Sequence, residues 1–189
     1  MNFNLKFKKT EIAENQKRSA KSLLNDTKIK TKFKASLKLP TAYRYIIEEE
    51  KFFWIRKELT SGNASLLIYE VPLSTIQKDS NTMTNIIQMR DSIGQKHIEG
   101  TLPNTYMITQ AAYSPYFFNI MLNGKKTFET KGTWELKNDF MAGPFINYAI
   151  RDEKNNRYLV IEGFCYNPSM AKRDIMHELE SIIKSVKLL

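Results

Sequence analysis

An Asn-Gly pair between two strand-like runs constrains the fold of this chain more than any other feature. The run YFFNIML (116–122) precedes Asn123-Gly124, and the alternating run KKTFETKGTWEL (125–136) follows it. A type I′ turn requires a positive φ at both central positions, which Asn and Gly adopt readily, so the pair predicts a tight antiparallel hairpin. Gly132 interrupts the second run and predicts a β-bulge or the close approach of another backbone.

Further strand-like runs extend this hairpin into a sheet. INYAIRD and RYLVIEGFCY flank the turn EKNN, so residues 105–165 predict a meander of antiparallel strands. Residues 43–47 and 52–57 flank an acidic turn and predict a second hairpin. The apolar run ASLLIYEVPL predicts a strand in the centre of the sheet.

Helical patterns separate these strands. Residues 79–98 have one apolar face and predict an amphipathic helix, and a continuous apolar stripe from Ile175 to Val186 predicts another, capped by Asn167 or Ser169. Residues 9–32 have only a thin stripe and predict a weakly docked helix. The sequence thus predicts an α+β fold, with one mainly antiparallel sheet of about seven or eight strands flanked by two or three helices.

The positive charge is concentrated at the N-terminus. Residues 1–38 hold 11 Lys/Arg and 3 Asp/Glu, whereas residues 39–189 hold 18 and 17, within a total net charge of +9. We therefore expect residues 1–34 to form a basic N-terminal segment and residues 35–189 to form a single α+β domain. The nearly neutral domain argues against nucleic acid as its partner. The basic segment is either a solvated face or a docking element for anionic lipid or nucleic acid.

The common catalytic and metal-binding motifs are absent from the sequence. It contains two His and one Cys, and lacks the G-x-S-x-G, G-x-x-x-x-G-K-[ST], H-E-x-x-H and G-x-G-x-x-G patterns. We therefore expect no cofactor, no metal site and no enzymatic activity, with Cys165 a buried, inert residue. No stretch approaches the ~18 apolar residues of a membrane helix, and residues 1–16 lack the apolar core of a signal peptide.

Several residues in the strands and helices are candidates for a binding site. Glu162 interrupts an apolar strand, and either faces solvent or lies in a groove with Arg56 or Arg90. His97 lies on the same helix face as Arg90 and is either a buried structural residue or part of a site. The complete set of candidates for ligand or partner binding is Trp54, Arg56, Arg90, His97, Trp134, Phe140, Met141 and Glu162.

The aromatic candidates have two interpretations each. Trp54 and Trp134 either pack in the core or form a surface on which a ligand stacks. Phe140 and Met141 lie in the connector NDFMAGPF (138–145), where Asn138-Asp139 and Gly143-Pro144 supply turn chemistry. We expect their side chains to close the end of the core beneath the loop, with an exposed binding lip as the alternative.

Several of these segments together resemble a known family. LPTAYRY, LLIYEVPL, FMAGPF (140–145), DEKNNR (152–157) and IEGF (161–164) look like the C-terminal half of the bacterial envelope lipoproteins of domain of unknown function 4837. The resemblance runs from about Lys30 to the C-terminus. It implies a cell-envelope location, a signal peptide, a lipidated cysteine and a further N-terminal half. The sequence contains none of the last three, so we expect a truncated chain, or a cytoplasmic protein if the chain is complete.

The resemblance carries no known activity and therefore no catalytic residue. More loosely, the layout is similar to the sandwich of the PsbP and Mog1 proteins, which are binding and assembly factors. We expect a non-enzymatic module that binds a protein, peptide or glycan. Two alternatives are a basic-tail module on anionic lipid or nucleic acid, and an enzyme whose polar site combines Arg56, Arg90, Asp91, His97 and Glu162.

Overall fold

The structure is a computed structural model that describes residues 10, 14 and 22–189. Most of the helix predicted over residues 9–32 lies outside the described residues. Its C-terminal end corresponds to a short helix, α2 (Thr27–Phe33).

Eight strands form one antiparallel sheet, as the sequence predicts. The order is β2-β3-β4-β9-β8-β7-β5, and β6 also pairs with β7. β4 lies between β3 and β9, which confirms its predicted interior position. A second, two-stranded sheet joins the two ends of the domain. The strands are β1 (Ala35–Ser36), β2 (Arg44–Glu48), β3 (Phe52–Leu59), β4 (Gly62–Pro72), β5 (Met107–Thr109), β6 (Tyr116–Leu122), β7 (Lys125–Leu136), β8 (Ala142–Asp152), β9 (Arg157–Tyr166) and β10 (Lys187–Leu188).

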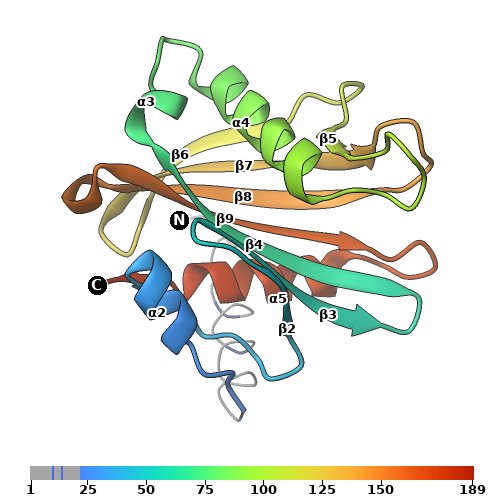
Figure 1. Ribbon diagram of the computed structural model, residues 1–189, viewed down its shortest axis with the longest axis horizontal. Coiled ribbons are helices and arrows are strands. Elements are labelled where there is room, and N and C mark those ends of the chain that lie inside the picture. The colour runs from blue at the N-terminus through green and yellow to red at the C-terminus, as the bar shows by residue number, and fades with distance from the viewer. Residues whose placement is uncertain (1–9, 11–13, 15–21) are drawn as a thin grey trace.

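Helices lie on both faces of the large sheet, which confirms the predicted α+β arrangement (Figure 1). The helix α4 (Thr82–His97), preceded by the short α3 (Leu73–Ile76), packs on one face, and α5 (Arg173–Lys184) packs on the other. A 3-10 turn, η1 (Glu153–Asn155), connects β8 to β9. In the described part of the chain, no helix is both long and apolar enough to cross a bilayer.

The last helix begins later than the sequence predicts. Lys172 occupies its N-cap position, whereas Asn167 and Ser169 were the predicted caps. Asn167 Oδ1 instead accepts a hydrogen bond of 2.7 Å from Ser61 Oγ, in the turn between β3 and β4. The side chain of Asn167, which the local sequence predicts to cap the helix, therefore binds a residue that is distant in sequence.

The helix α2 is part of the same core as the sheet. Ile29 and Phe33 are buried with residues of β3, β4 and α5, and the Phe33 ring packs edge-on against Phe53 at 4.9 Å. Leu189 N donates to Lys34 O at 2.9 Å, next to the pairing of β1 with β10. The predicted boundary after residue 34 therefore falls inside a packed unit.

The hairpin predicted from Asn123-Gly124 is confirmed, and both residues have positive φ, 49° and 78°. The prediction for Gly132 requires correction. Its pairing with Phe145 continues without a register shift, so there is no bulge. A Cβ at this position would lie 2.8 Å from the Phe145 ring and 3.3 Å from Pro115. Neighbouring side chains, rather than another backbone, therefore require the glycine.

Candidate functional site

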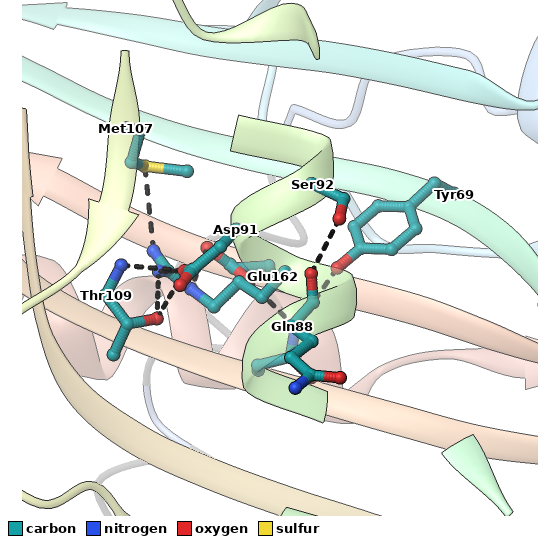
Figure 2. A network of polar contacts seen from close by, with 9 residues as sticks. Tyr69, Gln88, Asp91, Ser92, Met107, Thr109 and Glu162 are labelled. Atoms are coloured by element: carbon teal, nitrogen blue, oxygen red, sulfur yellow. Dashed lines mark hydrogen bonds and ion pairs between the residues drawn. The ribbon is translucent and has the colours of Figure 1, made fainter. Parts of the chain in front are cut away.

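A buried ion pair joins α4 to the centre of the sheet (Figure 2). Arg90 Nε donates to Glu162 Oε1 at 2.9 Å, and the two side chains are 1% and 0% exposed. Asn147 Nδ2 donates to the second carboxylate oxygen at 2.8 Å. The prediction that Glu162 pairs with Arg90 is confirmed, whereas a solvent-facing Glu162 is wrong. Pairing with Arg56 is also wrong, because Arg56 contacts Glu58 at 2.6 Å.

The remaining contacts of Arg90 fix its guanidinium between the helix and the sheet. Arg90 Nη1 donates to Thr109 Oγ1 at 2.8 Å, and the guanidinium lies 3.8 Å from the centre of the Phe145 ring. Asp91 Oδ1 accepts from Thr109 N and Thr109 Oγ1, both at 2.7 Å (Figure 2). These contacts hold α4 against β5 and β9 and satisfy the buried charges.

Burial raises the pKa of Glu162, and the nearby Arg90 and Asn147 partly offset this rise. The pKa of Tyr69, whose hydroxyl lies 3.4 Å from Asn147 Nδ2, is also raised, by burial and by the charge of Glu162. Perturbed carboxylates often mark active sites. Here, however, the carboxylate is sealed beneath the helix, so a substrate would reach it only if α4 moved away.

The two tryptophans do not form an open stacking surface. Trp134 is 2% exposed, and its Nε1 donates to Cys165 O at 3.2 Å. Trp54 is half-buried at the margin of the same cluster, where its Nε1 donates to Ser65 Oγ at 3.1 Å. The core interpretation holds for Trp134, and only Trp54 keeps a face at the surface.

His97 stacks on the Phe52 ring, with ring centres 3.8 Å apart, and its Nδ1 lies 3.6 Å from Glu49. Burial lowers its pKa, and Glu49 opposes this effect. This geometry agrees with the structural interpretation of His97. Of the residues proposed for an enzyme site, only Arg90, Asp91 and Glu162 form one cluster, so Arg56 and His97 do not contribute to a shared centre.

In the connector between β7 and β8, only one of the two side chains that were predicted to close the core packs against it. Met141 packs against the cluster that contains Trp134, as predicted. Phe140 is 104% exposed, so its predicted burial is wrong. Asn138 adopts a left-handed φ of 61°, and Asp139 Oδ1 accepts a hydrogen bond of 2.7 Å from Phe140 N. This local turn directs Phe140 away from the core.

An open cleft lies between α5 and the ends of β7 and β8, and we call it the α5 cleft. Its volume is about 460 Å³. Met176 and Ile146 give it an apolar floor, and Tyr116 of β6 stands at its margin with 72% of its surface exposed. The complete lining is Tyr116, Lys131, Gly132, Thr133, Pro144, Phe145, Ile146, Arg173, Met176, His177 and Glu180.

A charged cluster borders one side of the α5 cleft. Glu180 is 4% exposed, accepts a hydrogen bond of 3.1 Å from Tyr148 Oη, and forms ion pairs with Lys131 at 3.5 Å and Lys184 at 2.7 Å. Lys131 also pairs with Glu129. Burial and the two carboxylates raise the pKa of Tyr148 far above its usual range. Glu129 and Glu180 are thus both paired with lysines, and Arg173 lies at the exposed rim of the cleft.

The sequence analysis did not predict the α5 cleft. Its one signal near this site is Glu180, a charged residue in the middle of α5. This signal does not identify a cleft by itself, because the lining comes from three strands and a helix that are distant in the chain. Within the described residues, no group of three His, Cys, Asp or Glu side chains could hold a metal ion.

The comparisons with known proteins concern almost the whole domain. The family model described as "Domain of unknown function (DUF4837)" matches residues 22–185. These residues include α4, α5 and every strand of the large sheet. No curated protein matches the sequence. The chain therefore belongs to the family of that domain of unknown function.

Proposed function

We propose that this protein is a non-enzymatic binding module that holds a peptide segment of a partner protein in the α5 cleft. The observation that carries the proposal is an open, largely apolar cleft beside a charged cluster. The Arg90–Glu162 cluster, by contrast, is closed to solvent. Ligand sites combine apolar walls with a few polar groups that fix orientation, and the α5 cleft has this composition.

The lining favours a peptide with an apolar side chain next to an acidic residue. Met176 and Ile146 offer an apolar side chain more contact than a sugar ring, which needs polar partners around its edge. At the rim, Arg173 is exposed and Lys131 is partly exposed, whereas Glu180 is buried. An acidic residue of a partner can therefore reach the exposed Arg173 at the rim of the cleft.

Selection from a phage-displayed library of short random peptides on the purified protein tests this proposal. We expect enriched peptides to combine apolar and acidic residues, and NMR titration of one such peptide to shift amide signals of β7, β8 and α5. Arg173→Glu should weaken its binding at least about tenfold, because the rim charge is reversed. Arg44→Glu is the matched control, because Arg44 is also exposed but lies on β2, at the opposite edge of the sheet.

Tyr116→Ser and Tyr113→Ser form a second matched pair. The two tyrosines are 72% and 69% exposed, but only Tyr116 lines the α5 cleft. Only the first substitution should weaken binding. An absence of enriched peptides, or equal binding by the Arg173 and Arg44 variants, would overturn the proposal. Binding on a glycan array in place of peptides would assign the cleft to sugars.

We also propose a cell-envelope location, which the resemblance to envelope lipoproteins implies. Fractionation of the bacterium that produces the protein tests it with an antibody to this domain. Recovery with the envelope fraction is the expected result, and recovery with the cytosolic fraction alone would contradict it.

A further inference from the structure

The strand β6 is an edge of the large sheet that lacks the usual protection against pairing with another chain. It pairs with β7 from Tyr116↔Lys131 to Leu122↔Lys125 without a register shift. Among the described residues, no strand pairs with its other side. Proteins normally protect such edges with charged residues, proline or bulges, and residues 116–122 contain none of them.

The opposite edge of the same sheet, β2, has this protection. β2 begins with Arg44 and ends with Glu48, and its pairing with β3 shifts between Tyr45 and Ile47. Lys28 Nζ also donates to Glu48 Oε1 at 2.8 Å. Because the same sheet protects β2 and leaves β6 without a bulge or a charge, the difference points to a partner strand on β6.

Large apolar side chains extend along the β6 edge. Tyr116 is 72% exposed, Phe118 is 48% exposed and Met121 is 64% exposed. The segment before them, QAAYSP (110–115), and the strand itself are uncharged. The turn after β6 leads directly to Lys125 and Lys126, which are both exposed.

We propose that two copies of this chain pair antiparallel through β6, with a two-fold axis at Asn119. Pro115, which has no N–H to donate, limits the strand at one end, and the positive φ of Asn123 limits it at the other. Within these limits, full overlap of two antiparallel copies places Asn119 opposite Asn119 of the second copy.

Each opposing pair in this register is compatible. Phe118 faces Ile120, Phe117 faces Met121, and Tyr116 faces Leu122 of the second copy, so apolar residues meet on both faces of the joined sheet. Lys125 and Lys126 of the second copy lie near residues 110–115, which carry no positive charge. Alternate residues of an antiparallel strand direct their backbone groups to opposite sides. Leu122 pairs with Lys125 across the turn, so Leu122 and every second residue before it direct their backbone groups to β7. The residues between them therefore direct their N–H and C=O groups to the second copy; these are Phe117, Asn119 and Met121.

The pairing should be reversible. A single pair of seven-residue strands buries less than the ~1,600 Å² of a typical stable complex. We therefore expect a monomer–dimer equilibrium that depends on concentration. The dimer would also place Leu122 of the second copy beside Tyr116, at the margin of the α5 cleft.

Charge variants at Asn119 test the register, because this exposed residue faces itself across the axis. In sedimentation equilibrium, the wild type should gain mass with concentration. Asn119→Lys and Asn119→Asp should each raise the dimer dissociation constant at least about tenfold, because like charges then face each other. An equimolar mixture of the two variants should restore dimers by pairing Lys with Asp.

Asn81→Lys and Asn81→Asp are the matched controls, because Asn81 is exposed at the start of α4 and its side chain makes no capping hydrogen bond. Both should dimerise like the wild type. A wild type that stays monomeric at all concentrations would overturn the proposal. A dimer that persists in either Asn119 variant, or a mixture that stays monomeric, would exclude this register.

Discussion

Removal of one partner from the Arg90–Glu162 pair should destabilise the protein strongly, whereas removal of both should not. Arg90→Met keeps a long apolar side chain in the space of the arginine but leaves Glu162 with Asn147 as its donor. The double variant Arg90→Met/Glu162→Met replaces the pair by two side chains of similar length. Asn147 then still lies 3.4 Å from Tyr69 Oη.

The expected magnitude follows from the burial of the pair. Breaking a fully buried ion pair costs about 3–5 kcal/mol, because the remaining charge has lost both water and its partner. Arg90 and Glu162 are 1% and 0% exposed, so this range applies to Arg90→Met. The double variant should lie within about 1–2 kcal/mol of the wild type, since replacing a buried pair with apolar residues is often neutral or stabilising. The coupling between the two sites should therefore exceed about 2 kcal/mol.

The cost of Arg90→Met should depend on pH. Burial already raises the pKa of Glu162, and loss of the Arg90 charge raises it further. A carboxyl whose pKa is higher in the folded state contributes stability below its unfolded pKa of about 4.3. That contribution is lost as the pH rises through the folded-state pKa. The single variant should therefore be most destabilised near neutral pH and approach the wild type on acidification.

Urea unfolding monitored by circular dichroism at several pH values measures these differences. With a slope of about 2 kcal/mol/M, a loss of about 4 kcal/mol lowers the urea midpoint by about 2 M. The reasoning would be refuted if Arg90→Met cost less than about 1 kcal/mol at neutral pH. It would also be refuted if the double variant were as unstable as the single one, because the pair would then not be coupled.

Three further predictions follow from individual contacts. Phe140→Ala should change the free energy of unfolding by less than about 0.5 kcal/mol, because Phe140 is exposed, whereas Phe145→Ala should cost about 3–5 kcal/mol, because Phe145 is buried. Urea titrations that gave equal costs for the two variants would contradict this. Gly143→Ala should lower the melting temperature sharply, because its Cβ would lie 2.1 Å from Cys165 O, and calorimetry showing an unchanged melting temperature would be inconsistent with that contact. Cys165 is buried and its pKa is raised to about 11, so a thiol reagent at neutral pH should react only as fast as the protein opens; rapid labelling of the native protein would count against this burial.

The sequence predicted the sheet and its helices because those signals are local. The Asn123-Gly124 turn, the alternation of the strands and the apolar stripe of α4 depend on neighbours a few residues apart. A local prediction fails where a residue distant in sequence binds the same side chain or occupies the neighbouring space. Asn167 bonds Ser61 instead of capping α5, and Gly132 accommodates Phe145 and Pro115 instead of forming a bulge.

The candidate site was predictable only in part. The sequence left Glu162 either facing solvent or paired with Arg56 or Arg90, and the structure shows the pair with Arg90. The sequence could not show that α4 seals this pair from solvent, nor that Phe140 points outward while Met141 points inward. Such differences depend on the layers packed above each residue, which only the folded chain supplies.

By itself, the sequence determined the class of fold, the turns and the charge of each segment, because these properties depend on residue type and short spacing. Only the tertiary structure decided which polar residues meet and which lie at an exposed surface. Lys131, Arg173 and Tyr116 lie on three separate elements and come together at the α5 cleft because β6, β7 and α5 meet there. The same holds for β6: its apolar sequence reads as an ordinary strand, and only its place at the edge of the sheet makes it an interface.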